Sequence, residues 1–175
     1  YLCCIIWIKI KKMKTVSSIP SKIYSLWALE QEIKRWSLKN KRIVFTNGVF
    51  DILHEGHIAS LSQAAGYAEI LIVGLNSDAS VKRLKGSSRP VNNENARALI
   101  LASMVMVDAV TIFEEDTPLE LIKKILPDVL VKGGDYTIEQ IAGAKEVIAN
   151  GGEVILADIV EGISTTKIIE KMKNG

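Results

Sequence analysis

The sequence predicts a doubly wound α/β domain built on a parallel sheet of five strands. Three observations support this prediction: short apolar, β-branched runs recur along the chain, helical patterns separate them, and 175 residues that are 48% hydrophobic suffice for one compact core. Strands buried on both faces read as continuous apolar runs, and parallel strands need helical crossovers. We therefore interpret the chain as a single domain of this class.

The first expected element is an amphipathic helix over residues 22–39. Its apolar side chains, from Ile23 to Trp36, recur at spacings of three and four, the period of one helix face. Short apolar runs predict the strands, which are expected at 42–46, 69–75, 109–113, 128–132 and 153–157. Helical patterns follow these strands and predict helices near 57–67, 93–107, 117–126, 137–149 and 164–173. The segment 76–89 is expected to be a loop.

The first twelve residues, YLCCIIWIKIKK, do not fit this pattern. Their apolar run precedes the lysines and is far shorter than the roughly 18 residues of a membrane span, so neither a secretory signal nor a span is predicted. We interpret residues 1–12 as a non-native or disordered leader and Met13 as the natural start. Residues 13–40 are expected to form an N-terminal helical segment and 41–175 the main domain. Removal of the leader should leave folding and activity intact.

Cysteine usage and net charge limit the cellular compartment and the classes of ligand that we expect. Both cysteines lie in the leader, at positions 3 and 4, so the rest of the chain has no disulfide framework and fits a reducing cytoplasm. The 22 basic and 20 acidic residues give a net charge of +2, which offers no electrostatic reason to expect binding to nucleic acid or to a membrane surface. If the protein binds an anionic ligand, basic side chains or N–H groups at the binding site must therefore supply the attraction.

The loops at the carboxyl ends of the strands are the expected place for a site. Ligands of doubly wound sheets bind there, close to helix N-termini whose free N–H groups attract anions. These loops carry a concentration of basic side chains, among them Lys85, Arg89 and Lys132. The expected loops are 47–57, 76–89, 114–117, 132–135 and 161–166. This edge of the sheet is predicted to bind phosphate.

Both histidines of the chain lie in one of these loops, FTNGVFDILHEGH, as His54 and His57 with Gly56 between them. Residues three apart at a helix entry can reach one ligand, and a phosphate would favour their protonated forms. The alternatives are a pair of surface or core histidines and a zinc site. The metalloprotease motif places its histidines four apart, however, and no cysteine ligand follows Met13. The position at the carboxyl edge favours phosphate.

Two further loops agree with a phosphate site. In EGISTTKII, Ser164 suits a helix N-cap, and Lys167 in the first turn opposes the helix dipole unless an anion occupies the helix end. An ordinary solvated lysine is the alternative. The pair Gly133-Gly134 follows a strand and is either a simple turn or a place where a flat ligand lies against the backbone. Neither loop decides the question alone.

Four segments in order, TNGVFDILHEGH, NSDASVKRLKGSSRPVN, LVKGGDY and EGISTTKII, resemble the nucleotidyltransferase superfamily marked by HxGH. Their order and spacing are similar to those of bacterial adenylyltransferases that act on D-glycero-β-D-manno-heptose 1-phosphate. The resemblance extends from about Lys22 to Lys173. HxGH alone occurs by chance, whereas four ordered segments are a highly specific signal. The resemblance implies a Rossmann-like fold.

The resemblance also implies roles for individual residues. His54 and His57 would stabilise the pentacovalent α-phosphorus and the departing pyrophosphate, with Lys85 near the phosphates. The nucleotide-binding positions that it implies are Asn47, Gly48, Phe50, Gly56, Arg97, Gly134, Asp135, Ser164, Thr165 and Thr166. No protein ligand of a metal is implied, because Mg²⁺ is expected to bind mainly through the ATP phosphates and water.

The implied reaction transfers AMP from ATP to the sugar 1-phosphate and gives ADP-heptose and pyrophosphate for lipopolysaccharide-type glycan assembly. A separate heptose kinase would supply the acceptor, and a homo-oligomer is compatible with the resemblance. A sibling cytidylyltransferase acting on glycerol 3-phosphate is the nearer alternative, and a noncatalytic nucleotide-binding module is the remoter one. The loop at 133–135 favours ATP over CTP by resemblance, and the retention of both histidines argues against the module.

Overall fold

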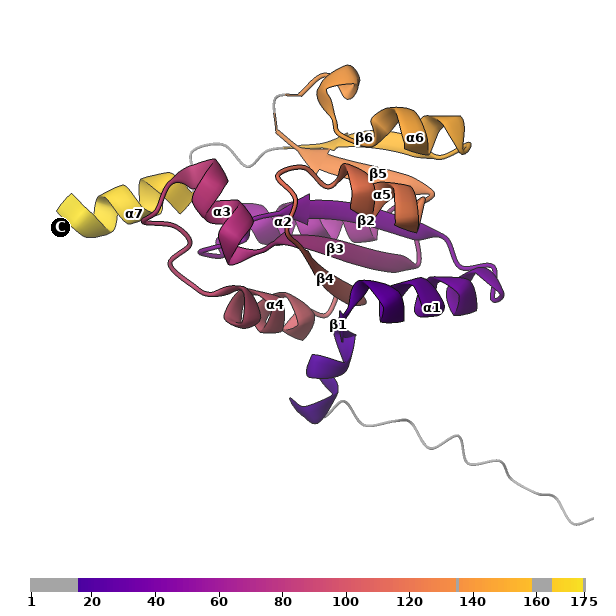
Figure 1. Cartoon of the computed structure of the whole chain (residues 1–175), viewed down its shortest axis with the longest axis horizontal. Helices are drawn as coiled ribbons and strands as arrows, with labels where there is room; N and C mark the ends of the chain where they lie inside the picture. Colours follow the sequence, from indigo (N-terminus) through magenta and orange to yellow (C-terminus); the bar gives the residue numbers. More distant parts are fainter. Residues whose placement is uncertain (1–15, 135, 159–164, 175) are drawn as a thin grey trace, which may run out of the picture.

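The computed structural model describes residues 16–134, 136–158 and 165–174, and its strands form one parallel sheet in the order β1-β4-β3-β2-β5-β6 (Figure 1). The strands are β1 (Ile23–Tyr24), β2 (Ile43–Gly48), β3 (Ile70–Asn76), β4 (Ala109–Phe113), β5 (Val129–Gly133) and β6 (Glu153–Ala157). The helices are α1 (Leu26–Ser37), α2 (Glu55–Ala65), α3 (Asp78–Lys85), α4 (Glu94–Ser103), α5 (Leu119–Ile125), α6 (Ala144–Ala149) and α7 (Thr165–Asn174). Short 3₁₀ turns add η1 (Val16–Ser18), η2 (Pro20–Lys22) and η3 (Ile138–Gln140).

The strand order reverses beside β2. The chain runs from β2 through β3 to β4 on one side, then crosses back to place β5 on the other side of β2, with β6 beyond it. In open α/β sheets the ligand crevice lies at such a switch point, outside the carboxyl ends of the strands. The segments that follow β2 and β5 are therefore brought together at this edge.

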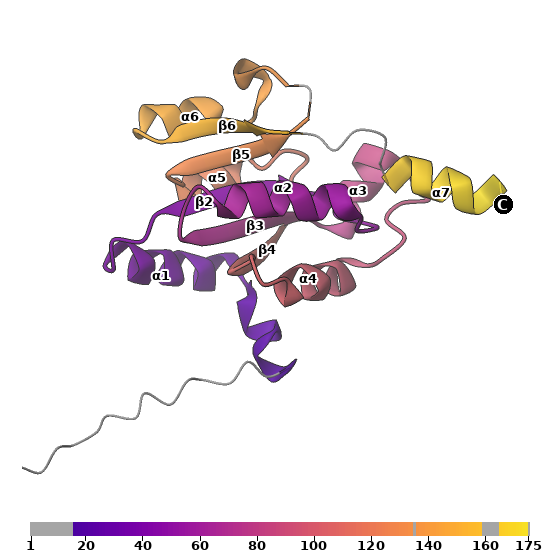
Figure 2. The ribbon, with the colours of Figure 1, turned by 180° about the vertical axis from the view of Figure 1, so that it is seen from behind.

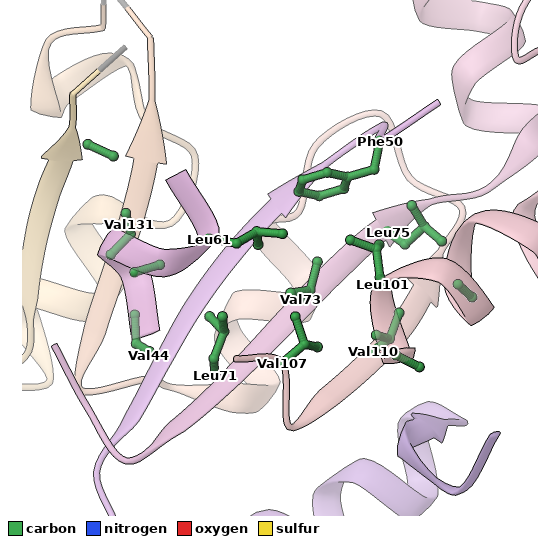
Figure 3. Close-up of a cluster of buried hydrophobic side chains, with 14 of the residues drawn as sticks. Val44, Phe50, Leu61, Leu71, Val73, Leu75, Leu101, Val107, Val110 and Val131 are labelled. Carbon is green, nitrogen blue, oxygen red and sulfur yellow. The ribbon is translucent and has the colours of Figure 1, made fainter. Parts of the chain in front are cut away.

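Helices cover both faces of the sheet, as Figures 1 and 2 show from opposite sides. Alternate strand residues point to opposite faces, so Leu71 and Val73 of β3 join a cluster with α2 and α4, while Ile72 joins a cluster with α1, α5 and α6. Figure 3 shows part of the first cluster, in which Leu61 of α2 and Leu101 of α4 lie over the strands. Both faces are buried, as the continuous apolar runs predicted.

The sheet has six strands among the described residues, one more than the sequence predicted. The extra strand, β1, lies within the segment expected to be the start of the first helix and pairs with β4 through Ile23↔Val110 and Tyr24↔Thr111. Ser25 then caps α1, because its hydroxyl accepts from the Ala28 N–H. Two residues are too few to leave a period-2 pattern, so the strand had no sequence signal.

Two other segments differ from the prediction. The expected loop at 76–89 contains α3, whose Ser77 N-cap accepts from the Ser80 N–H. The expected helix at 137–149 is broken into η3 and α6 by Gly143, which has a φ of +86°. A Cβ on Gly143 would lie 2.6 Å from Cδ1 of Ile122, so the close approach of α5 also requires glycine here. Within the described ranges, no helix is long and apolar enough to cross a membrane.

Candidate functional site

A cavity of about 270 Å³ opens at the switch point, and we call it the histidine cavity. Its lining residues come from the end of β2 and the loop after it, from α2, from the end of β5 and the residue after it, and from the segment after β6. They are Thr46, Asn47, Gly48, Val49, Phe50, His54, Gly56, His57, Ser60, Gly133, Gly134 and Asp158.

The loop after β2 is shaped around Phe50. This residue has a positive φ of 46°, which is uncommon for a bulky side chain, and its ring is buried in the first core cluster. A Cβ on Gly48 would lie 2.9 Å from the Phe50 ring, so glycine is needed where the ring folds back over the strand. The same ring lies 5.2 Å from the His57 ring, centroid to centroid. Phe50 thus joins the core to the histidine cavity.

The two histidines are held together at the first turn of α2. His54 is the N-cap residue in an extended conformation, and the centroids of the His54 and His57 rings lie 3.9 Å apart. The His54 N–H donates to Nδ1 of His57 at 3.4 Å. Because this bond makes Nδ1 the acceptor, the neutral His57 ring carries its proton on Nε2. Nδ1 of His54 is buried and has no hydrogen-bond partner among the described residues.

Both imidazoles are neutral in the ligand-free protein at neutral pH. Burial, with a smaller contribution from the neighbouring His54, lowers the pKa of His57 to about 4. Burial also lowers the pKa of His54, against a smaller opposing effect of Glu55. A bound phosphate would reverse these shifts, because an anion within a few ångströms favours the charged imidazole. The pair can therefore acquire positive charge when an anion arrives.

Asp51 fixes the middle of the loop and is not among the residues that line the cavity. Its buried carboxylate accepts from Arg89 Nε at 2.6 Å, from the Val91 N–H at 2.8 Å and from the Asn92 N–H at 3.0 Å. The Asn92 side-chain amide donates in turn to the Asp51 carbonyl at 2.9 Å. Asp51 was not among the site residues that the sequence predicted. A short acidic residue after a strand carries no signal that separates a loop support from an ordinary turn.

Arg97 is placed differently from the sequence prediction. It is 1% exposed and lines neither this cavity nor the neighbouring one. Its guanidinium donates to the Val49 carbonyl at 2.6 Å, to the Asn92 carbonyl at 3.0 Å and to Oδ1 of Asp78 at 2.7 Å. The structure thus places Arg97 beneath the loop, where it supports the loop backbone, and contact with the nucleotide stays a prediction.

A second cavity of about 400 Å³ adjoins the first, and we call it the lysine cavity. The two share Asn47, Gly48 and Val49 as a common wall. Lys85, at the end of α3, lines this second cavity together with Lys132 of β5. The remaining lining residues are Asn76, Leu84, Asp116, Thr117, Pro118, Tyr136, Gln140, Ile141 and Ala142.

The predicted hydroxyl cluster is described only in part. Oγ1 of Thr165 donates to the Ile52 carbonyl at 3.3 Å, which joins the start of α7 to the loop after β2. Asp135, Ser164 and the side chain of Thr166 lie outside the described residues. Their roles stay predictions.

The structure brings seven predicted residues to the histidine cavity, namely Asn47, Gly48, Phe50, His54, Gly56, His57 and Gly134. Sequence reasoning missed Ser60 and Asp158 as lining residues. Ser60 had a signal, since it lies three and four positions after His57 and Gly56 on the same helix face. Asp158 also had one, because it follows β6 directly at the carboxyl edge. Among the described residues, no group of three or more metal-ligating side chains occurs.

Comparison with known proteins places this site in a family. The model of the cytidylyltransferase-like family matches residues 45–171. Two relatives carry the name bifunctional protein HldE. The one from Rhodopseudomonas palustris (strain BisB18) is 59% identical over 147 residues, 84% of this chain and 30% of the relative. The one from Rhodospirillum rubrum is 52% identical over 160 residues, 91% and 32%. The chain thus spans about a third of the length of these relatives.

Two solved structures share the fold. The lipopolysaccharide core biosynthesis protein from Thermoplasma volcanium GSS1 is 27% identical with a TM-score of 0.55, over 69% of this chain and 97% of that one. The pantoate-beta-alanine ligase from Francisella tularensis has a TM-score of 0.57 over 86% of this chain and 76% of that one. At 15% sequence identity, this similarity is evidence for the fold alone. The predicted doubly wound α/β class is confirmed.

Proposed function

The chain belongs to the cytidylyltransferase-like family of nucleotidyltransferases, and from this premise we propose that it transfers AMP from ATP to D-glycero-β-D-manno-heptose 1-phosphate. The products are ADP-heptose and pyrophosphate. The observation that carries the proposal is the paired His54 and His57 in a cavity at the switch point of the sheet, which shares a wall with a second, lysine-lined cavity. Two adjoining cavities suit a reaction that joins two phosphorylated substrates.

The chemistry follows from the neutral histidine pair. An oxygen of the acceptor phosphate attacks the α-phosphorus in line, the bond from that phosphorus to the β-phosphate oxygen breaks, and the electron pair leaves with pyrophosphate. Negative charge grows on the equatorial and leaving oxygens. His57 presents an Nε2–H donor, and both imidazoles become better donors as this anionic charge raises their pKa values. The protein forms no covalent bond with either substrate.

Mg²⁺ belongs to this proposal as a companion of ATP. It commonly binds through substrate phosphates and water and keeps much of its hydration shell, so it needs no dedicated cluster of protein carboxylates. The described lining of the histidine cavity holds two neutral imidazoles, the acidic residue Asp158 and no lysine or arginine, so it suits a nucleotide that brings its own counter-ion. When bound, the ion supplies charge neutralisation on the phosphates.

The proposed reaction also requires another enzyme to supply its acceptor. Its acceptor must come from a reaction that phosphorylates a heptose at the anomeric position, for which a heptose kinase is the expected partner. We keep the cytoplasmic location and the homo-oligomeric state as predictions. The location rests on the absence of cysteine from residues 13–175.

Pyrophosphate release tests the proposal directly. The chain is supplied with ATP or CTP against D-glycero-β-D-manno-heptose 1-phosphate, other sugar 1-phosphates and glycerol 3-phosphate. We expect turnover with ATP and the heptose 1-phosphate to exceed every other combination. Faster turnover with CTP and glycerol 3-phosphate would contradict the proposed adenylyl transfer and favour the sibling cytidylyltransferase reaction. Nucleotide binding without turnover of any acceptor would favour a noncatalytic module.

A further inference from the structure

The lysine cavity has walls that suit a polyhydroxylated anion. Amide and hydroxyl groups of Asn76, Thr117 and Gln140 line it, and all of them can exchange hydrogen bonds with sugar hydroxyls. The Tyr136 ring adds an apolar surface at the same cavity. A nucleobase would need a flat slot, whereas this lining of dispersed polar groups matches a sugar.

Lys132 occupies the boundary between the two cavities. Its ammonium group donates to Oδ1 of Asn47 at 3.2 Å, and Asn47 lines both cavities. Nζ lies 5.8 Å from the centroid of the Tyr136 ring. An ammonium group has three N–H donors, and the hydrogen bond to Asn47 uses one of them. Within the described residues this group makes no second hydrogen bond, so its other donors are available to a ligand at the shared wall.

The charges around the lysine cavity favour an anion. Within the described ranges, neither Lys132 nor Lys85 forms an ion pair. Asp116, the acidic residue of the described lining, is held by Arg83 at 2.7 Å. Burial lowers the pKa of Lys132, and among the described residues no ion pair offsets the loss of solvent. A phosphate next to Nζ would supply that charge.

We propose, on the basis of the adenylyl transfer proposed above, that the lysine cavity takes the sugar phosphate and that Lys132 holds the acceptor's phosphate at the shared wall. This placement leaves an acceptor oxygen facing the histidine cavity, where the α-phosphorus of ATP lies. Lys132 keeps its proton throughout, so its contribution is electrostatic and positional. The new bond joins the acceptor oxygen to the α-phosphorus, and pyrophosphate carries away the electron pair.

The test separates the two substrates kinetically. In Lys132→Met we expect the KM for heptose 1-phosphate to rise about ten- to a hundredfold, the usual value of a hydrogen bond to a charged group. The KM for ATP should change less than about twofold, since Lys132 does not line the histidine cavity. Lys132→Arg should keep part of the acceptor binding, and Lys124→Met, an exposed lysine away from both cavities, should behave as the wild type.

Stability and pH provide readouts that a structural role would not give. Methionine replaces a desolvated amine by an apolar chain of similar length, so Lys132→Met should melt no lower than the wild type. The alkaline limb of kcat/KM for the acceptor should move to higher pH in Lys132→Arg, because arginine does not deprotonate. A rise in the KM for ATP alone would assign Lys132 to the nucleotide, and unchanged KM values for both substrates would overturn the proposal.

Failure of the proposed reaction can be distinguished from failure of the Lys132 assignment. If the wild type uses another phosphorylated acceptor, the same KM comparison is made with that acceptor and still tests Lys132. If no acceptor turns over, heptose 1-phosphate is titrated calorimetrically into the wild type and Lys132→Met without ATP. Binding to the wild type that is lost in the variant supports the assignment. Equal binding, or no binding to either protein, contradicts it.

Discussion

Two groups of polar side chains flank the loop after β2, and they are bonded in opposite ways. Asp51 and Arg97, beneath the loop, are buried and accept or donate three hydrogen bonds each. The side chains of His54 and His57, at the cavity, have one weak hydrogen bond, which Nδ1 of His57 accepts from the His54 N–H, and Nδ1 of His54 has no described partner. Fully bonded buried charges hold the loop in place, whereas an unpaired polar atom that lies beside a cavity is available to a ligand. This difference in hydrogen bonding distinguishes the residues that support the loop from the residues that we expect to contact the substrate.

The largest effect should come from breaking the supporting group. Arg97→Met leaves the Val49 and Asn92 carbonyls without their donor and removes the partner of Asp78, so the free energy of unfolding should fall by about 3–5 kcal/mol. Urea unfolding measures the loss. Arg35→Met removes an exposed i,i+3 ion pair and is the matched control, with an expected change below about 1 kcal/mol.

The same variant decides between the two interpretations of Arg97. If the guanidinium acts on the nucleotide, as the family resemblance implies, ATP binding should disappear while stability is preserved. If it supports the loop, stability falls first. Arg97→Lys should recover only part of the loss, because one ammonium cannot reproduce the planar fork that reaches three oxygens.

The next largest effect should come from the under-bonded group. Changing His54 or His57 to alanine should lower kcat about 10²- to 10³-fold, or roughly 2.7 to 4 kcal/mol of transition-state stabilisation. The free energy of unfolding should change by less than about 1 kcal/mol, because each ring makes few hydrogen bonds. Steady-state kinetics and urea unfolding are measured on the same preparations. A variant with near-normal kcat that melts many degrees lower would mark that histidine as structural.

The double variant sharpens this point. The rings lie 3.9 Å apart and share one environment, so we expect them to act on one phosphate as a unit. Removing both should then cost clearly less than the product of the two single losses in kcat, since groups that act together are not additive. Multiplicative losses would instead show two independent contributions.

The sequence predicted the under-bonded group better than the supporting one. The histidines, Gly48 and Phe50 lie in one continuous segment whose position after a strand is visible in the pattern of residues. The support depends on Asp51 meeting Arg89, 38 positions away, and on Arg97 reaching Val49, 48 positions away. Such pairings depend on the path of the chain between the strands, which local patterns do not specify. Arg97 was predicted as a site residue from the family resemblance, and local patterns could not show that it is buried.

The fold shows the same division. Five strands and most of the helices between them follow from hydrophobic patterns of ordinary length, and the structure has them, whereas α3 lies in a segment that was predicted to be a loop. The two-residue β1 and the break at Gly143 depend on tertiary contacts, with β4 in the first case and with Ile122 in the second. Lys132 was noticed as a cation at the end of a strand, but its contact with Asn47 across the switch point required the pairing of β2 with β5.

The acid sensitivity of the free protein should be a smaller effect of the same pair. The folded pKa of His57 is about 4, below the ordinary value of 6.5, so the unfolded chain binds more protons between these values. Stability is therefore retained above pH 6.5 and lost as the pH falls toward 4. His57→Gln should lose less free energy of unfolding than the wild type between pH 7 and pH 5. Equal losses in the two proteins would show that His57 is not held neutral by the fold.

The smallest effect, and the most direct test of unused capacity, is proton uptake on nucleotide binding. If ATP phosphates approach the pair, the lowered pKa values of His54 and His57 must rise, and at pH 6 the complex should take up a proton from solution. Two coupled imidazoles 3.9 Å apart repel each other when both are charged, so the uptake should not exceed about one proton. Calorimetric titrations with ATP in two buffers of different ionisation enthalpy measure it without turnover. ATP's own phosphate also titrates near this pH, and the double alanine variant corrects for that contribution. Equal proton uptake by the wild type and the variant would mean that the phosphates bind away from the histidines. The contrast between the fully hydrogen-bonded Asp51 and Arg97 and the ligand-binding His54 and His57 would then be wrong.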